Sequence, residues 1–366
     1  MKIGIITFHR TVNYGAALQA YALQKTVEKL GNKVETIDYR NMDIYGYYDP
    51  DYFAGQSIKT KIGKIIRYSY NKKVFSRFER FWDEKMKWSR TCATRDELRM
   101  VEKEYDAVIC GSDQVWNPKA IKNDFEAYLL GTAECRRISY AASAGNVSLW
   151  EPYLKTYWEL LHRFHALSVR ESDMQLPAEH LSQKSVQVVL DPTLLLRKDD
   201  WLAAESTEMV TSLPEKGYIL VYFLGDNPEV VKAAKEMQSK TGLPIISLGR
   251  KIKGVRAYRP AAGPQEFLAL FHHASYVLTS SFHGTVFSIQ YRRPFLVFGN
   301  GAYNSRMNTL LQLLGIEERM WSGAQHNIEE AICAPIDWDT LESRLETEQE
   351  HSIAFLKEAL DDTEKG

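Results

Sequence analysis

The sequence predicts an α/β protein built from two Rossmann-like domains, and three observations carry this prediction. The chain opens with a strand, a helix and a second strand, the order that forms a βαβ unit with parallel strands. A second series of short apolar strands and helices begins at Tyr218. The length of 366 residues is roughly that of two domains. We expect an N-terminal domain over 1–205, a C-terminal domain over 206–335, and a last helix over 336–366 that crosses back to the first domain.

The overall composition excludes several classes of protein. The chain is 45% hydrophobic and 25% charged with a net charge of −1, so no global field indicates nucleic acid. The 4 cysteines contain no C-x-x-C pair, which argues against a disulfide framework and a zinc site. The N-terminal apolar run is too short for a signal peptide, and no run of about 18 apolar residues could span a membrane. These features predict a cytoplasmic protein.

The first βαβ unit carries polar residues in its first loop. Lys2–Phe8 and Val34–Asp38 are rich in β-branched residues and are predicted strands, and the segment between them has apolar residues at helical spacing. The loop lacks G-x-G-x-x-G, so a dinucleotide is not indicated. It carries Asn13, Tyr14 and Gly15 just before the helix, and a glycine there lets the backbone approach a ligand closely. A plain turn without a ligand is the alternative.

The segment over 41–100 interrupts this βα rhythm and is predicted to be a helical insertion. Residues 41–58 are rich in Tyr, Asp and Gly and are predicted to form a loop, and 59–90 is predicted to be helical and is basic and aromatic. Such a helix can hold an anionic lipid surface or a diphosphate-linked substrate, or its aromatic side can simply pack while its basic side faces water. The basic residues are Lys59, Lys61, Lys64, Arg67, Lys72, Lys73, Arg77, Arg80, Lys85, Lys87 and Arg90.

Polar residues follow the next strand, Tyr105–Cys110, in a Gly-Ser-Asp turn. This turn places Asp113, Gln114 and Trp116 at the carboxyl edge of the sheet, where open α/β sheets bind ligands. Carboxylate and amide groups can bind sugar hydroxyls, and an indole ring offers an apolar platform.

Three further strands of the first domain also end in polar residues. Because parallel strands end at one edge of a sheet, we expect the residues that follow the strands to gather there. A lone arginine at a strand end is usually a surface charge, but several polar strand ends together favour a site. The residues that these strands and the preceding one deliver are Asp113, Ser143, Arg170 and Asp191.

The second βα series follows a polar linker over 197–216. Its predicted strands are 218–223, 244–248, 276–279 and 295–298, and its predicted helices are 265–273, 304–314 and 338–360.

The stretch Tyr276–Phe298 reads as strand, tight turn, helix and strand. Ser280 and Ser281 can cap the helix, which places His283 in its first turn at the carboxyl edge of the sheet. Helix N-termini attract anions, so this position suits a phosphate or carboxylate. A histidine that only packs or caps is the alternative.

In their order along the chain, these motifs resemble those of the polysaccharide pyruvyltransferase family. The resemblance covers most of residues 1–315 but not the 41–100 segment or the C-terminal tail. The matching pieces are ITFHRTVNYGAALQAYAL, DAVICGSDQVWNP, SYAASAG, LSVRE, VVLDPTLLL, SSFHGTVFSIQYRRPF and NSRMNTLLQLLG.

This resemblance implies two domains arranged as in GT-B glycosyltransferases, with the site in the interdomain cleft. It also implies transfer of pyruvate from phosphoenolpyruvate to a sugar of an envelope or capsular glycan, usually as a ketal. The family's arginine and histidine that bind the donor correspond to Arg170 and His283. Some members have an arginine where this chain has Ser281, and Arg306 is the candidate replacement.

The chemistry of ketal formation assigns roles to these residues. Arginine binds phosphate and carboxylate in a bidentate manner, so Arg170 and Arg306 are expected to bind the donor together with the turn from Ser281 to Gly284. His283 would protonate the methylene carbon of phosphoenolpyruvate and Asp113 would accept the proton of the attacking sugar hydroxyl. The expected acceptor-binding residues are Asn13, Tyr14, Gln114 and Trp116.

Two rival functions remain open at this point. One is a GT-B glycosyltransferase that uses a nucleotide sugar, and the other is a catalytically silent glycan- or nucleotide-binding protein. No cofactor and no metal are expected, because no His, Cys, Asp or Glu cluster at ligand spacing is visible. The basic insertion makes a lipid-diphosphate-linked acceptor and contact with the inner membrane face an open alternative.

Overall fold

The structure is a computed structural model that describes residues 1–41, 44–46, 51, 61–62, 68–252, 257–258, 260–299, 305–323 and 327–361. Its contacts divide the chain into two compact units, one formed by Met1–Leu196 with Glu346–Gly366 and the other by Arg197–Leu345. We call them unit 1 and unit 2. The boundary lies before the predicted 205/206 because Trp201 is buried in unit 2, where its ring meets Phe287 edge-on at 5.0 Å.

Unit 1 is built on a parallel sheet with strand order β2-β1-β3-β4, and β5 and β6 form a pair that continues it. The register sets Ile5 opposite Thr36 on one side and Ile109 on the other. Bridges from Ile138 to Ala166 and from Ala142 to Val169 connect the two parts. The strands are β1 (Lys2–Ile6), β2 (Lys33–Thr36), β3 (Ala107–Cys110), β4 (Arg136–Ser139), β5 (Leu167–Val169) and β6 (Val186–Val188).

Helices cover this sheet, and apolar side chains fill the space between the layers. The core includes a group of large aromatic rings, Trp116, Trp150, Tyr157 and Phe164, all fully or almost fully buried. The helices are α1 (Tyr14–Lys29), α4 (Tyr68–Lys85), α5 (Arg95–Glu102), α6 (Phe125–Tyr128), α7 (Leu154–Leu161) and α8 (Gln175–Ser182).

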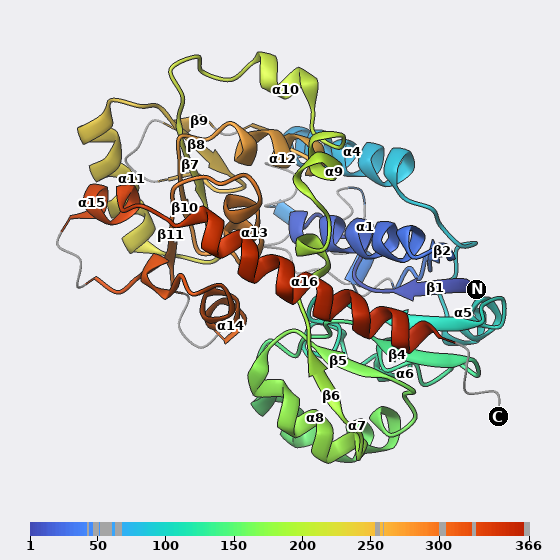
Figure 1. Ribbon diagram of the computed structural model, residues 1–366. Helices are drawn as coiled ribbons and strands as arrows, with labels where there is room; N and C mark the ends of the chain where they lie inside the picture. The colour runs from blue at the N-terminus through green and yellow to red at the C-terminus, as the bar shows by residue number, and fades with distance from the viewer. Residues whose placement is uncertain are drawn as a thin grey trace. The chain divides into compact units, whose positions relative to one another are not determined.

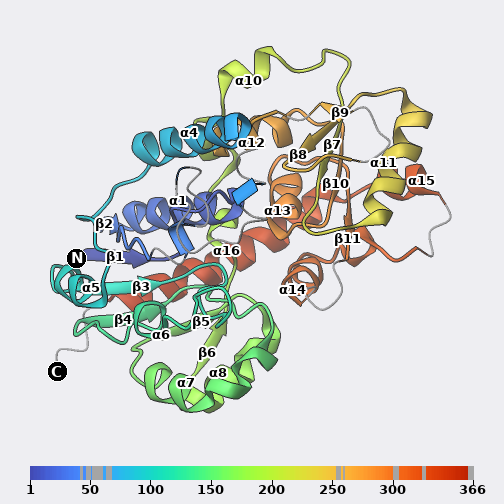
Figure 2. The same cartoon turned by 180° about the vertical axis from the view of Figure 1, so that it is seen from behind.

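Most of the described part of the basic-aromatic segment over 59–90 is α4, which lies beside α1 in both views (Figures 1 and 2). Its aromatic side is buried: Phe78 lies 5.3 Å from the ring of Tyr14, and Phe81 lies 5.6 Å from that of Tyr21. The packing interpretation of this segment is therefore confirmed for Phe75, Phe78, Phe81 and Trp82 of α4. Most of 41–67 lies outside the described residues.

Unit 2 is built on a six-stranded parallel sheet with the order β12-β11-β10-β7-β8-β9. Figure 1 shows α11 and α15 on one face of this sheet and α12 and α13 on the other. The strands are β7 (Ile219–Tyr222), β8 (Ile245–Leu248), β9 (Ala257–Tyr258), β10 (Tyr276–Thr279), β11 (Phe295–Phe298) and β12 (Met320–Trp321). The helices are α9 (Lys198–Leu202), α10 (Thr207–Thr211), α11 (Pro228–Thr241), α12 (Pro264–His272), α13 (Phe282–Gln290), α14 (Ser305–Leu314) and α15 (Ile328–Cys333).

The last helix, α16 (Trp338–Leu360), contributes to both units. In unit 2, Glu342 pairs with Arg292. In unit 1, the Ser352 hydroxyl accepts a hydrogen bond from the Leu190 amide at 3.0 Å. No helix in the described ranges is long and apolar enough to span a bilayer.

Candidate functional site

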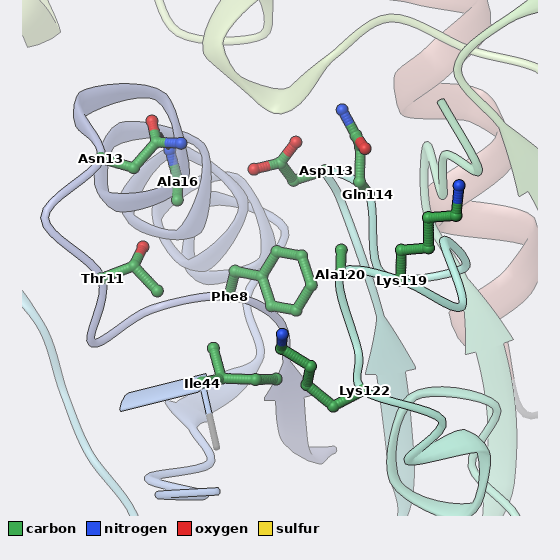
Figure 3. Close-up of a pocket in the computed structure, with 10 residues that line it drawn as sticks. All are labelled: Phe8, Thr11, Asn13, Ala16, Ile44, Asp113, Gln114, Lys119, Ala120 and Lys122. Atoms are coloured by element: carbon green, nitrogen blue, oxygen red, sulfur yellow. Dashed lines mark hydrogen bonds between the residues drawn. The ribbon is translucent and has the colours of Figure 1, made fainter. Parts of the chain in front are cut away.

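A cavity of about 380 Å³ opens in unit 1 beside the ends of β1 and β3 (Figure 3). Figure 3 shows Asn13 and Asp113 on one side of the Phe8 ring and Lys122 on the other. Three of the predicted site residues, Asn13, Asp113 and Gln114, thus line one hollow. The lining residues are Phe8, Thr11, Asn13, Ala16, Ile44, Asp113, Gln114, Lys119, Ala120 and Lys122.

Asp113 is fixed in this cavity by the backbone on both sides of it. Its φ of 69° lies in the left-handed region, which aspartate tolerates better than most residues. The amide of the preceding Ser112 donates to the buried Gln19 side chain of α1 at 3.0 Å, and the Ser143 amide donates to the Asp113 carbonyl at 3.0 Å. The turn after β3 is therefore held by both the first helix and the neighbouring strand end.

Arg170 lies directly behind Asp113 and is surrounded by carboxylates. Its guanidinium donates to Asp191 and, at 3.4 Å, to Asp113, and Glu171 lies within ion-pair distance at 3.9 Å. Burial alone would lower the pKa of Arg170, but Asp191, Asp113 and Glu171 together raise it above its usual value. The side chain is only 2% exposed, so Arg170 orients acidic groups rather than presenting an open cation to solvent. Direct contact with a donor stays a prediction.

The residues predicted to gather at the ends of the strands lie together in unit 1. They are Asp113, Ser143, Arg170 and Asp191. The Ser143 hydroxyl donates to Glu171 at 2.5 Å, and the Ser112 hydroxyl donates to Asp191 at 3.2 Å. Asp191 also accepts from the amide and hydroxyl of Thr193. Each buried carboxylate thus has hydrogen-bond donors, which is what burial of a charge requires.

Asn13 and Tyr14, both predicted to bind the acceptor, lie in different surroundings. The Asn13 side-chain oxygen caps α1 by accepting from the amides of Gly15 at 3.0 Å and Ala16 at 3.4 Å, which leaves its amide nitrogen to face the cavity. Tyr14 is 8% exposed and packs on Phe78 of α4. Its ring stabilises the contact between α1 and α4.

Trp116 was predicted to offer an apolar platform to the acceptor, and the structure corrects this prediction. Its side chain is 0% exposed and packs against Trp150 and Phe164. Its ring N–H donates to the Tyr128 carbonyl at 3.2 Å. Burying so large a ring stabilises the core of unit 1. Its neighbour Gln114 does line the cavity and accepts from Asn117 at 2.6 Å.

Two cations and one amide of the site were not singled out from the sequence. Lys119 and Lys122 line the cavity and face solvent, and Gln19 supports the turn that carries Asp113. The two lysines follow the Trp-Asn-Pro sequence of the β3 loop, but exposed lysines are common, so spacing alone gave no signal. Gln19 lies in the middle of α1 among apolar residues. A polar side chain that is fully buried there needs hydrogen-bond partners, and this position is the signal that could have singled it out.

In unit 2, the turn between β10 and α13 forms as predicted. Ser281 caps α13 by accepting from the Gly284 amide at 3.4 Å, and the Ser281 amide donates to the Thr279 hydroxyl at 3.0 Å. A Cβ at Gly284 would lie 2.2 Å from that same hydroxyl oxygen, so only glycine allows this close packing. The amides of Ser281 and Gly284 are thus used within the turn.

His283 lies in the first turn of α13 and is 7% exposed, with its ring edge-on to Phe282 at 5.2 Å. Arg306 lies in the first turn of α14 and is partly buried. The two helix starts are neighbours, because the Thr285 hydroxyl of α13 contacts the Met307 sulfur of α14 at 3.1 Å. This neighbourhood makes Arg306 a reasonable substitute for a cation at position 281.

Comparison with known proteins adds a family and a fold. The sequence model of a family described as polysaccharide pyruvyl transferase matches residues 13–302. No curated protein sequence matches the chain. Among solved structures, the UDP-GlcNAc 2-epimerase of Neisseria meningitidis matches with a TM-score of 0.53 at 12% identity, covering 98% of this chain and 99% of that one.

A second structure, a putative UDP-N-acetylglucosamine 2-epimerase of Listeria monocytogenes, matches with a TM-score of 0.53 at 9% identity, covering 100% of this chain and 98% of that one. Identities this low show the fold alone. They confirm the predicted fold class, an α/β chain with two Rossmann-like units of the GT-B kind. The location of the site in an interdomain cleft stays a prediction.

Proposed function

The chain belongs to the polysaccharide pyruvyl transferase family, and we propose that it moves pyruvate from phosphoenolpyruvate to a sugar of an envelope or capsular glycan precursor as a ketal. The observation that carries this proposal is the family match over residues 13–302, which includes the cavity residues Asn13 and Asp113 and the helix start at His283. Phosphoenolpyruvate is a co-substrate in this scheme, and no cofactor is required.

The reaction begins when the protonated His283 side chain transfers a proton to the methylene carbon of phosphoenolpyruvate. This transfer leaves carbon two electrophilic. A sugar hydroxyl attacks carbon two and gives its proton to a carboxylate. The C–O bond to phosphate then breaks, inorganic phosphate leaves with the bonding electron pair, and a second hydroxyl of the same sugar closes the ketal and loses its proton. The products are the pyruvyl ketal and phosphate.

Asp113 is the proposed base for the hydroxyl. Its carboxylate lines the cavity, whereas Asp191 is 1% exposed and occupied by Arg170, Ser112 and Thr193. Arg170 supports this role by holding one oxygen of Asp113 in place at 3.4 Å. A fixed carboxylate at the wall of a cavity is the arrangement that general base catalysis needs.

Phosphoenolpyruvate carries at most three negative charges, so its binding site needs hydrogen-bond donors and cations. The positive end of α13 and the Arg306 guanidinium are the proposed groups from unit 2. Direct binding of phosphoenolpyruvate by Arg170 stays a prediction, and the contact of Arg170 with Asp113 positions that carboxylate. The acceptor is proposed to occupy the unit 1 cavity, where the Asn13 and Gln114 amides face hydroxyl groups and Lys119 and Lys122 suit a phosphate-bearing carrier.

The direct test is incubation of the protein with phosphoenolpyruvate and a panel of lipid-linked and nucleotide-linked sugars. A pyruvyl mass gain on one acceptor with equimolar release of phosphate is the expected result. Release of a nucleoside diphosphate from a nucleotide sugar, with phosphoenolpyruvate left intact, would support the glycosyltransferase alternative. Binding of phosphoenolpyruvate without consumption across the panel would favour a silent binding protein.

Replacing His283 separates its chemical role from its packing role. We expect His283→Gln to lower kcat by at least about 100-fold, the usual scale of general acid catalysis, while thermal stability stays close to that of the unsubstituted protein. The matched control is His351→Gln, an exposed histidine on α16, which should keep full turnover. Normal turnover by His283→Gln would remove the imidazole from the mechanism.

A further inference from the structure

Unit 2 contains a cluster of two histidines and one glutamate that the proposed reaction does not use. The Nδ1 atom of His272 lies 3.0 Å from one carboxylate oxygen of Glu205, and the Nε2 atom of His273 lies 3.3 Å from the other. We propose that Glu205, His272 and His273 form a zinc-binding site. Nitrogen and carboxylate ligands in this combination are those that Zn²⁺ prefers in proteins.

The fold itself brings these three side chains together. His272 is the last residue of α12, and His273 follows as its C-cap, with its amide bonded to the Ala269 carbonyl at 3.1 Å. Glu205 lies in the turn between α9 and α10, and the amide of the next residue, Ser206, donates to the Gln265 carbonyl of α12 at 3.0 Å. The cluster therefore sits on two segments that are already hydrogen-bonded.

The spacing of the ligand atoms is close to that of a zinc site. One ligand atom from each residue can be chosen so that all lie within 4.8 Å of one another. Tetrahedral ligands at about 2.1 Å from zinc lie about 3.4 Å apart, so small rotations of the two imidazoles close the site. Three protein ligands leave a fourth position for water, and the side-chain exposures of 13% for Glu205, 19% for His272 and 36% for His273 leave a path for the ion.

The charges around the cluster are mixed. The Arg293 cation opposes a dication, and the Glu205 carboxylate offsets this.

A buried phenol beside the cluster has no partner within the described part of the chain. The Tyr291 ring lies 4.9 Å from that of His272, the residue is 1% exposed, and its hydroxyl makes no hydrogen bond to a described residue. Buried hydroxyls normally have a partner, and a water molecule on the metal would supply one.

This site is not visible in the sequence, and the expectation of no metal rests on that. Ligand spacing is visible only when the residues are near one another in the chain, whereas Glu205 and His272 are 67 positions apart. Once formed, the site would fasten the segment that follows α9 to the end of α12. The proposal thus places the ion in unit 2, at residues that the reaction proposed above does not use.

The test uses the tag-free full-length protein and Zn²⁺ alone, titrated in competition with a chromophoric chelator. We expect one zinc per chain, and Co²⁺ in its place should give the intense visible bands of four-coordinate cobalt. Glu205→Gln, His272→Ala and His273→Ala should each weaken zinc binding by at least about 100-fold, since even neighbours of metal ligands contribute 10–100-fold. The control, His180→Ala, removes an exposed histidine of unit 1 and should change nothing.

A second measurement covers the case in which an alanine variant fails to fold. In the unsubstituted protein, zinc should slow amide exchange in peptides that contain Glu205 and His273 and leave unit 1 unchanged. Absence of stoichiometric zinc binding would overturn the proposal and leave the cluster as two histidines sharing one carboxylate. Tight binding that survives Glu205→Gln together with unchanged exchange at these peptides would also overturn it, by placing the ion elsewhere.

Discussion

Arg170 illustrates what a strand-end residue reveals before its neighbours are known. Its position at the carboxyl end of β5 was correctly predicted, and so was its proximity to Asp113 and Asp191. The pairing itself could not be read from the sequence, because Asp113 and Asp191 follow two other strands and their distances to the guanidinium depend on the fold. The guanidinium is matched by buried carboxylates, so the residue acts through Asp113 rather than as an isolated cation.

Asp113 is the residue at which the proposed base catalysis can be tested. Asp113→Asn keeps the side-chain volume and suits the left-handed backbone at φ 69°, so the fold should persist. Loss of the carboxylate should lower kcat for pyruvyl transfer by about 10²–10⁴-fold with a smaller change in the KM for phosphoenolpyruvate.

Steady-state kinetics alongside Asp173→Asn, an exposed aspartate, provide the comparison for this variant. Should Asp113→Asn turn over as fast as Asp173→Asn, the hydroxyl must be activated by another group. A large rise in KM alone would instead indicate that Asp113 only binds.

Titration of Glu102 should make the stability of the fold depend on pH. It ends α5, is 1% exposed, and burial raises its pKa from the usual 4.5 to about 7. The folded state therefore holds a proton that the unfolded state has released between these values, so the free energy of unfolding falls as pH rises from 4.5 to 7 and is level above. The full effect is about 3 kcal/mol.

Glu102→Gln removes this titration, so its advantage over the unsubstituted protein should be small near pH 5 and reach its maximum above pH 7. Thermal unfolding across this range measures the difference. Glu151→Gln, at an exposed position, should show no such trend. An advantage that is the same at pH 5 and pH 8 would mean that Glu102 is not protonated in the folded state.

At the scale of elements, local signals predicted the strands and helices that hold the site. The strands at 276–279 and 295–298 have the predicted bounds, and α13 begins at Phe282, which places His283 in its first turn as predicted. The residues that predict these elements lie within the elements or next to them, as runs of β-branched residues, a serine cap and a glycine. Burial of Trp116 and Tyr14 could not be predicted in this way, because it depends on which distant helix covers each ring.

The aromatic side of α4 is a second case in which burial could not be predicted from the sequence. Aromatic rings at helical spacing between basic residues fit a lipid surface or a packed helix equally well, and only the neighbouring α1 decides between them. With those rings buried, any contact with an anionic membrane would depend on the exposed lysines and arginines of the segment.

The cap of α1 gives a prediction for an element that also borders the cavity. Asn13→Ala removes the oxygen that accepts from Gly15 and Ala16 and should destabilise unit 1 by about 1 kcal/mol. Asn13→Asp keeps the cap and places a negative charge at the positive end of the helix, so its stability should match or exceed the original.

Both Asn13 variants lose the amide nitrogen that faces the cavity, which separates the two roles. Denaturant unfolding reports the cap, and the KM for the acceptor reports binding. Equal stability of the alanine and aspartate variants would refute the capping role. An unchanged acceptor KM in both would exclude Asn13 from the acceptor site.

At the scale of the whole chain, the C-terminal helix completes unit 1 although it follows unit 2 in sequence. That α16 returns to the first unit was predicted, but its contacts with Leu190 and Leu194 were not readable, because both partners are main-chain groups. These contacts lie next to Asp191, which holds Arg170, which in turn holds Asp113. The last helix is therefore linked to the cavity through three consecutive hydrogen-bonded pairs.

Substitution of Ser352 on α16 tests this link between the last helix and the cavity. It is 0% exposed, accepts from the Leu190 amide at 3.0 Å and donates to the Glu348 carbonyl at 2.7 Å. Ser352→Ala leaves a buried amide without its acceptor, which costs about 1–3 kcal/mol, so Tm should fall by a few degrees. Amide exchange should also accelerate over residues 188–194, since this strand end loses its anchor. Ser185→Ala, at an exposed position before β6, should leave both unchanged. If Ser352→Ala lowers Tm but exchange at 188–194 stays slow, the helix stabilises unit 1 without supporting the strand end behind the cavity.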